Sequence, residues 1–344
     1  MSIIDKPSDY FNTKLYTGTG SELALTGVGF QPDFTWIKGR SGATEHVLTD
    51  SVRGVTKELS SNDDGAEETV AQGLTAFGSD GFTVGTDGSY NTSSATYASW
   101  NWLGANGTAS NGSGSITSTV SANTTSGFSI VTYTGNASAG ATLGHGLSAT
   151  PKMMLIKRAT GGATQWVVYH VSTGNTKALY LNTTATPLTV TGFFNNTTPT
   201  SSVFTVGTDT ACNGDGNDMI AYCFADVQGY SKFGSYTGNG NADGTFVYTG
   251  FKPAFVMIKN SSHAGQYWEI FDNKRNTFNV NNNKLYPNAN LAEQQENFDI
   301  VSNGFKCRDT GGTNVSGNTY IYMAFAEEPF VTSTTNGSIP ATAR

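Results

Sequence analysis

Three polar loops carry the side chains whose types and spacing could form a binding site. They read GTDGSYNTSSAT, GTDTACNGDGND and RDTGGTNVSGNT, at positions 85–96, 207–218 and 308–319. Carboxylates and amides can hydrogen-bond to sugar hydroxyls, and a tyrosine ring can stack on a sugar, so loops of a β-sandwich are natural recognition sites. The candidate ligand-binding residues are Asp87, Tyr90, Asn91, Asp209, Asn213, Asp215, Asn217, Asp309 and Asn314. Turn formation alone is the competing interpretation, because the same residue types favour turns.

The middle loop also resembles the start of a calcium-binding loop. Asn213, Asp215 and Asn217 alternate as its first three oxygen ligands would. The glycine of the sixth position and the glutamate of the twelfth are missing, since Asp218 and Phe224 stand there. We therefore assign no metal and no cofactor to the chain.

An acidic and a basic residue recur three positions apart in two places, as Asp50 with Arg53 and Asp272 with Arg275. The matching stretch in the middle of the chain has His170 instead. A surface or turn-stabilising ion pair is one interpretation, and a carboxylate–guanidinium site for an anionic sugar is the other.

The sequence does not indicate an enzyme. Its four histidines stand outside any HExxH or serine-hydrolase pattern. Glu45, Glu67 and Glu68 could serve as glycosidase carboxylates, but adjacency in sequence does not establish the separation that the reaction requires. We expect these glutamates to lie on a solvated face.

The polar loops belong to a frame that the chain repeats three times. Each copy begins with a YTG motif, at Tyr16, Tyr133 and Tyr236. A proline-led apolar strand ending in lysine follows in each copy, at Lys38, Lys157 and Lys259. An aromatic residue then stands 20 positions after a phenylalanine, giving the pairs Phe82 with Trp102, Phe204 with Phe224 and Phe305 with Phe325. Alternate apolar residues before each closing aromatic predict a strand with one buried face.

These repeats predict an all-β fold of three tandem β-sandwich units with a jelly-roll, concanavalin-like topology. The expected division is a first unit at 1–104, a Ser/Thr/Asn/Gly linker at 105–126, a second unit at 127–230, a third at 231–334 and a tail at 335–344. The linker is expected to be flexible or extended, so that units two and three pack more rigidly than units one and two. A single large β-propeller is the alternative architecture.

Composition narrows the functional class. The 344 residues include 41 glycines, 12% aromatic and only 13% charged residues, which is typical of extracellular or virion-borne β proteins. A net charge of −7 with scattered Lys and Arg argues against nucleic-acid binding. The three cysteines are expected to be buried free thiols. The N-terminus has no secretion signal pattern, and no apolar run predicts membrane insertion.

Several motifs in order resemble one family along nearly the whole chain. They include DKPSDYFNTKLYTGTG, GFQPDFTWIKGRS, SDGFTVGT, YCFADVQGYSKFGSYTGNG and TYIYMAFAEEPF. The chain is similar to virion proteins of tailed phages of marine bacteria, including those that infect Pelagibacter and cyanobacteria. This resemblance implies a tail-fibre-like virion protein with lectin-type sandwiches, made in the bacterial cytoplasm and exposed on the particle.

The expected function is that of a non-enzymatic phage adhesin, in a tail fibre or spike, that recognises host surface glycans. Its expected partners are other phage virion proteins, a host glycan and further copies of the chain in a homotrimer. One alternative is a capsid decoration, head-fibre or tail accessory protein without a ligand. Another is a polysaccharide depolymerase.

Overall fold

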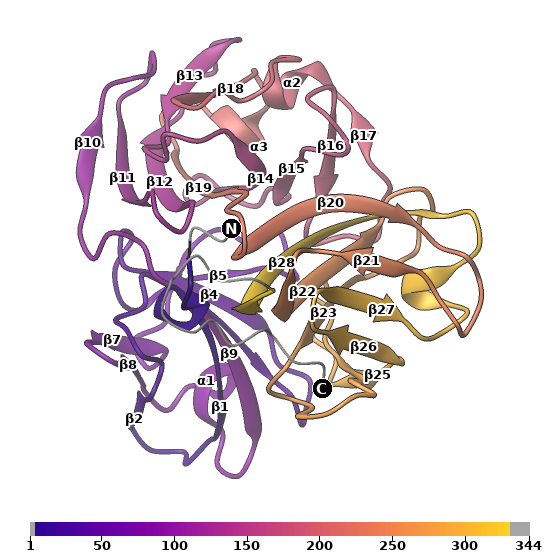
Figure 1. The fold of residues 1–344 in the computed structure, drawn as a ribbon. Helices are drawn as coiled ribbons and strands as arrows, with labels where there is room; N and C mark the ends of the chain where they lie inside the picture. Colours follow the sequence, from indigo (N-terminus) through magenta and orange to yellow (C-terminus); the bar gives the residue numbers. More distant parts are fainter. Residues whose placement is uncertain (1–3, 331–344) are drawn as a thin grey trace.

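A computed structural model describes residues 4–330, and it confirms that the chain is all-β. Strands make up 44% and helices 6% of the structure, and the strand ladders are antiparallel. Figure 1 shows three groups of strands arranged around a common centre. The tail predicted at 335–344 lies outside the described residues.

We call the three groups unit one (residues 7–102), unit two (109–225) and unit three (231–329). Unit one comprises η1 (Pro7–Asp9), β1 (Phe11–Thr17), β2 (Leu23–Thr26), β3 (Phe34–Gly39), β4 (His46–Asp50), β5 (Lys57–Ser60), β6 (Glu68–Thr69), β7 (Leu74–Gly78), β8 (Gly81–Val84), α1 (Gly88–Asn91) and β9 (Thr96–Trp102). Unit two comprises β10 (Ala109–Asn111), β11 (Ser118–Asn123), β12 (Phe128–Thr134), β13 (Ala141–Gly144), β14 (Pro151–Arg158), β15 (Val167–His170), β16 (Lys177–Tyr180), β17 (Leu188–Thr189), α2 (Thr191–Phe194), β18 (Val203–Val206), α3 (Thr210–Asn213) and β19 (Asp218–Ala225). Unit three comprises β20 (Ser231–Thr237), β21 (Phe246–Tyr248), β22 (Phe251–Asn260), β23 (Trp268–Asp272), β24 (Asn283–Lys284), β25 (Gln294–Gln295), β26 (Phe298–Val301), β27 (Gly304–Cys307), η2 (Gly312–Asn314) and β28 (Thr319–Pro329).

The three units share one strand order. The larger sheets read β1-β9-β3-β4-β5-β6, β10-β11-β12-β19-β14-β15-β16-β17 and β20-β28-β22-β23. In each, the first and last strands of the repeat pair, and the proline-led strand lies beside the last one. The smaller sheets are β2-β8-β7, β13-β18 and β21-β27-β26. The repeated frame of the sequence therefore corresponds to a repeated topology.

The stretch expected to be a flexible linker contributes two strands to unit two. β10 pairs with β11, and β11 pairs with β12, so both extend the larger sheet of unit two. Val120 is buried, whereas most of their other residues are hydroxyl or amide side chains. β10 lies at the edge of the sheet and pairs on one side only, whereas β11 pairs on both sides. Residues 109–111 and 118–123 are therefore extended strands that belong to the larger sheet of unit two.

One face of each larger sheet packs into a single core that all three units share. Trp102, Phe224 and Phe325 are fully buried there, at the closing-strand positions that the sequence singles out. Their ring centroids lie 6.2 Å apart for Trp102 and Phe224, 5.6 Å for Trp102 and Phe325, and 5.9 Å for Phe224 and Phe325. We call these three rings the aromatic triangle. The predicted burial of this face is confirmed, but its partners are the other two units.

The opposite face of each larger sheet packs on its own smaller sheet. Phe82, Phe204 and Phe305 are fully buried in three separate clusters, one in each unit. The larger sheets are therefore buried on both sides, which explains why β9, β19 and β28 are buried along almost their whole length.

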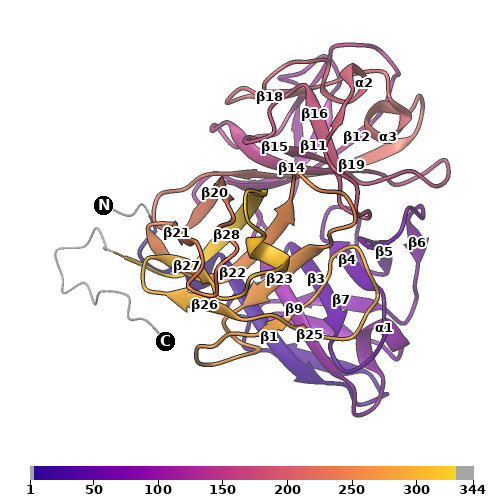
Figure 2. The ribbon, with the colours of Figure 1, turned by 90° about the vertical axis from the view of Figure 1, so that its right-hand side faces the viewer.

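Backbone hydrogen bonds close the three units into a ring. The N–H of Thr164 in unit two donates to the carbonyl of Asp64 in unit one over 2.9 Å. The N–H of Gly265 in unit three donates to the carbonyl of Thr184 in unit two. The N–H of Thr44 in unit one donates to the carbonyl of Asn290 in unit three, which closes the ring. Figure 2 shows unit two at the top, resting on the other two units. We call the contacts of units one and two, two and three, and three and one the first, second and third seams.

A buried lysine stands near the end of each proline-led strand, and two of the three lysines donate a hydrogen bond across a seam. Burial lowers the pKa of Lys38, Lys157 and Lys259 to about 8 each. Backbone carbonyls accept from the ammonium groups, including Asn290 across the third seam and Asp64 across the first. The recurring lysine of the sequence frame is thus a buried structural residue.

The three cysteines are free and buried, which confirms the expectation for them. Within residues 4–330, no helix has the length and apolar character of a membrane span.

Removing a ring of the aromatic triangle should destabilise the whole ring of units. We expect Phe224→Ala to cost about 3–5 kcal/mol of unfolding free energy, because it leaves a cavity between three units. Denaturant unfolding followed by tryptophan fluorescence should show one cooperative transition at a lower midpoint. Phe278, which is 74% exposed, gives the control, since Phe278→Ala should change stability by less than about 0.5 kcal/mol. A loss confined to unit two would contradict this prediction.

Candidate functional site

The polar loop of unit one fastens the YTG turn rather than facing solvent. Asn91 is fully buried, and its amide nitrogen donates to the carbonyls of Gly85 (2.7 Å) and Ser21 (2.6 Å). Its amide oxygen accepts from the N–H of Thr19 over 2.7 Å. The hydroxyl of Tyr16 donates to the carbonyl of Tyr90 over 2.7 Å. The tyrosine of the motif and the asparagine of the loop therefore form one latch.

Units two and three repeat this latch with their own residues. Asn213 accepts from the N–H of Asn136 and donates to the carbonyls of Gly207 and Ser138. Asn314 accepts from the N–H of Asn239 and donates to the carbonyls of Asp309 and Asn241. The tyrosines match as well, because Tyr133 donates to Cys212 and Tyr236 to Thr313.

Close backbone contact explains the glycine of the motif. A Cβ atom at Gly18 would lie 2.2 Å from the carbonyl oxygen of Thr92, a distance that real contacts do not reach. The matching distances for Gly135 and Gly238 are 2.3 and 2.4 Å, again to loop carbonyls. Only glycine lets the YTG turn lie against its loop.

Four of the candidate ligand-binding residues are buried. Asn91, Asn213 and Asn314 use their amides inside the latches, and Tyr90 is 1% exposed with its hydroxyl 3.3 Å from that of Thr49. Their recurrence nine positions after Phe82, Phe204 and Phe305 was the sequence signal for a shared structural role of the asparagines.

The other five candidates are more accessible and lie in separate units. Asp87 and Asp209 cap short helices by accepting from the N–H groups of Ser89 and Ala211. Asp309 accepts from the N–H of Thr310, and the amide of Asn217 donates to the carbonyl of Asp215. The structure distributes the nine candidates over the polar loops of three units and does not bring them together in one site.

An asparagine latch should matter for stability, whereas its exposed neighbour should not. Asn213→Ala leaves one N–H and two carbonyls without their partner, so we expect a loss of about 2–4 kcal/mol in unfolding free energy. Asp215→Ala, on the exposed part of the same loop, should stay within about 0.5 kcal/mol of the parent protein. Equal effects of the two substitutions in thermal unfolding would rule out the latch.

The first seam contains a buried network around Asp50 and Arg53. The Arg53 Nε donates to Asp50 over 2.5 Å, and its Nη2 donates to the carbonyl of Leu48 over 2.9 Å. Its Nη1 donates to Glu67 over 3.2 Å. Tyr222 of unit two donates its hydroxyl to Asp50 over 2.8 Å. The pair is therefore not a surface ion pair: it holds its turn and joins two units.

The third seam has the same network with Asp272 and Arg275. The Arg275 Nε donates to Asp272 over 2.6 Å, and its Nη1 donates to Glu293 over 3.1 Å. Trp100 of unit one takes the role of Tyr222 and donates its indole N–H to Asp272 over 3.1 Å. Burial raises the pKa of Asp272, but the Arg275 guanidinium more than offsets this effect and holds the pKa below its usual value.

The second seam uses a neutral histidine in place of the ion pair. His170 is fully buried, and its Nδ1 accepts from the N–H of Ser172 over 3.1 Å. Its Nε2 therefore carries the proton, which it donates to the carbonyl of Tyr322 in unit three over 3.1 Å. Burial lowers the pKa of His170 to about 4.

Acid should weaken the second seam. The pKa of His170 is lower in the folded than in the unfolded protein, so its stabilising contribution is complete above about pH 6.5 and decreases as the pH falls toward 4. Between pH 7.5 and 5 we expect a loss of about 2 kcal/mol from this residue. His170→Asn should reduce the pH dependence of the unfolding free energy by that amount. An unchanged pH dependence of the unfolding free energy in His170→Asn would contradict the role assigned to His170. Burial also lowers the pKa of His46 and of His145, so these two histidines account for the pH dependence that remains in the variant.

A pocket of about 360 Å³ opens at the first seam. Threonine hydroxyls and three charged residues dominate its lining, which consists of Arg53, Glu67, Thr117, Thr119, Thr132, Tyr133, Thr134, Ala159, Thr160, Asp218 and Met219. Along β12 the inward side chains change from Phe128 and Ile130 in the shared core to Thr132 and Thr134 in the pocket. The pocket thus lies at the end of the inner sheet face of unit two, beyond the last residues that pack into the shared core.

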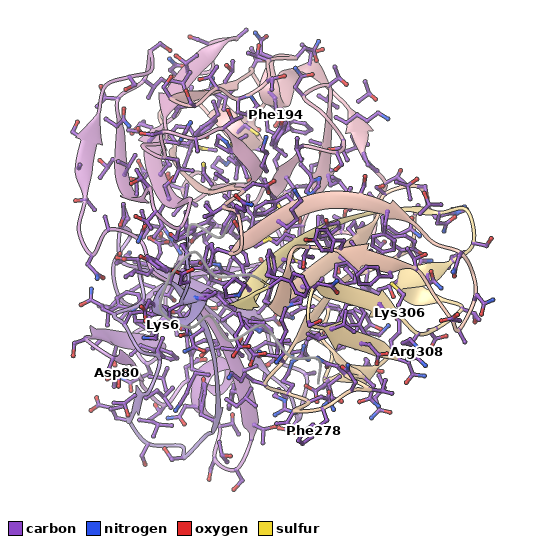
Figure 3. All side chains as sticks on the ribbon, viewed as in Figure 1. Lys6, Asp80, Phe194, Phe278, Lys306 and Arg308 are labelled. Atoms are coloured by element: carbon purple, nitrogen blue, oxygen red, sulfur yellow. The ribbon has the colours of Figure 1, made fainter. Side chains whose placement is uncertain are left out.

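The smaller sheet of unit three exposes two aromatic side chains on its outer surface. Phe246 and Tyr248 on β21 are 47% and 60% exposed. Lys306 on the neighbouring β27 lies opposite Phe246 and forms an ion pair with Asp243. We call Phe246, Tyr248 and Lys306 the outer face of unit three; Figure 3 shows Lys306, together with Arg308, at the periphery of the molecule.

The aromatic side chains of the outer face have no counterpart in the other units. Phe246 and Tyr248 flank Val247, which pairs with Phe305. The residues that flank the matching leucines are Ala24 and Thr26 in unit one and Thr142 and Gly144 in unit two. Since the repeated fold needs no large side chains at these positions, packing does not account for the aromatic pair.

An acidic pocket of about 200 Å³ lies in unit one. Its charged lining residues are Glu45, Glu58, Asp63 and Glu68. Burial raises the pKa of Glu58 to about 7, so this carboxyl is partly protonated near neutral pH. Among the described residues, no three His, Cys, Asp or Glu side chains are arranged to hold a metal ion.

These features define a class: an all-β protein of three repeats closed around a shared aromatic core, with polar networks in its seams. A family model described as "Domain of unknown function (DUF7483)" matches residues 6–329. The chain therefore belongs to that family, and the match extends over all three units. No curated protein and no solved structure matches the chain.

Proposed function

We propose that the protein is a non-enzymatic surface protein of a bacteriophage virion, an adhesin of the tail-fibre or spike type that binds host surface glycans. In this proposal each unit is a lectin-type, concanavalin-like jelly roll. The sequence resemblance to marine phage virion proteins supports the context. A closed ring of three units supports a rigid carrier for an exposed recognition surface.

The outer face of unit three is the observation that carries the glycan proposal. Sugar rings present apolar C–H faces that pack on aromatic rings, and their hydroxyls hydrogen-bond to flanking charged groups. Phe246 and Tyr248 supply the rings, while Lys306 and Asp243 supply the charged groups. Exposed aromatic side chains without a packing role are typical of interaction sites.

Substitution of the outer face should abolish glycan binding without affecting the fold. We expect purified protein to bind a subset of bacterial surface glycans on an array, and Tyr248→Ala to weaken that binding at least tenfold in biolayer interferometry. Thr26→Ala changes the matching position of unit one and should leave binding unchanged. The proposal is wrong if the protein, alone or multimerised, binds no glycan of its host.

Polysaccharide hydrolysis is the second candidate function, and the acidic pocket of unit one is the observation that favours it. A carboxyl with a raised pKa next to other carboxylates can serve as a general acid. In that case the protein would release reducing ends from host capsule, and Glu58→Gln would stop the release. A decoration protein without ligand would instead lie on the capsid in a virion reconstruction and bind no glycan.

A further inference from the structure

The first and third seams contain matching backbone hydrogen bonds. Residues of one seam can therefore be assigned to equivalent residues of the other. The N–H of Glu67 donates to the carbonyl of Ala159 over 2.8 Å, and the N–H of Glu293 donates to the carbonyl of Arg40 over 2.9 Å. The N–H groups of the acceptor residues match too, since Ala159 donates to Asp218 over 2.8 Å and Arg40 donates to Thr96 over 2.7 Å. Glu67 therefore corresponds to Glu293, and Ala159 corresponds to Arg40.

The two seams differ in the second side chain that pairs with the glutamate carboxylate. In the third seam the Arg40 guanidinium donates to both carboxylate oxygens of Glu293, over 2.9 and 3.0 Å. Arg275 donates to the same carboxylate, so one glutamate holds two guanidinium groups. In the first seam Arg53 takes the place of Arg275, but alanine replaces the second arginine. The space without a side chain is the pocket lined by Glu67 and Ala159.

We propose that the first-seam pocket binds a guanidinium group, presented by an arginine side chain of a partner protein. The third seam provides the model for this contact, because there an arginine side chain on a polypeptide fills the equivalent position. A guanidinium group and a carboxylate match in a planar, two-bond geometry.

The electrostatics of the pocket suit a cation. Four N–H groups of Arg53 already donate to Asp50, Glu67, Leu48 and Tyr222. The Oε1 atom of Glu67 has only the ammonium group of Lys57, 3.5 Å away on a side chain that is 38% exposed. Asp218, exposed on the far wall, adds a second carboxylate. A guanidinium group entering the pocket can therefore pair with Glu67 as Arg40 pairs with Glu293.

This inference goes beyond glycan binding and does not depend on it. The pocket lies between units one and two, whereas the outer face belongs to unit three. Its ligand would fix the protein to another protein rather than to a host sugar. Loss of either activity can therefore be measured while the other persists.

The test uses capped arginine as the probe, Nα-acetyl-L-arginine methylamide, in NMR titrations of the full chain. We expect millimolar binding with shifts at the first seam. The matched citrulline derivative has the same shape without the charge and should bind at least tenfold more weakly. Free L-arginine should bind no more tightly than the capped probe, since the proposed source is a side chain.

Substitutions at the two equivalent positions, Ala159 and Arg40, should have opposite effects on probe binding. Ala159→Arg should fill the pocket from within, raise the melting temperature and abolish probe binding. Arg40→Ala should open the matching space at the third seam and raise the number of probe sites from one to two. Glu67→Gln, a second variant that leaves the pocket open, should weaken binding at least tenfold.

Three results would overturn the proposal. They are no binding of capped arginine to the parent protein, equal binding of the citrulline derivative, and unchanged probe binding in Ala159→Arg or Glu67→Gln. Tighter binding of free L-arginine would assign the pocket to a small molecule and so reject the protein partner.

Discussion

The structure depends on the contact of three aromatic rings, one from the closing strand of each unit. Trp102, Phe224 and Phe325 meet at the centre, and each larger sheet turns one face toward them. A sheet that is apolar on both faces needs cover on both sides. The smaller sheets cover one face, and only the other two units can cover the second. Hence no unit has a complete core of its own, and three repeats form one body.

The shared core also places charged groups where a sandwich would not bury them. The inner faces of the sheets become polar toward their ends. There Arg53 donates to the hydroxyl of Tyr222 in unit two, Trp100 donates to Asp272 in unit three, and Lys38 and Lys157 donate to carbonyls of the neighbouring unit. Removing one member of a buried ion pair costs far more than a surface pair contributes. These networks therefore fix which unit faces which. His170 joins units two and three without a charge. Because burial lowers its pKa, this contact weakens in acid.

The sequence predicts the repeats, the strands and the buried positions, because period-two alternation and fixed spacing are local properties. It does not reveal what covers a buried face, since Trp102 would alternate in the same way in an isolated sandwich. It also does not distinguish an amide that faces water from one that, like Asn91, bonds to the backbone of the YTG turn, because both stand in turn-forming sequences. The strands at 109–111 and 118–123 have few apolar residues and so lack the signal on which strand prediction relies.

The closed ring determines when the protein can fold during its synthesis. A ribosome releases Trp102 roughly ten to forty seconds before Phe325, at ordinary elongation rates. Throughout this interval the inner sheet face of the first unit lacks part of its cover, because unit three has not fully emerged. Nascent chains on neighbouring ribosomes expose the same apolar sheet face. A unit from another chain has the same sequence as the unit that follows in the same chain, so it can pack on this face equally well. Pairing between units of different chains is thus the misfolding event that the closed ring favours during synthesis.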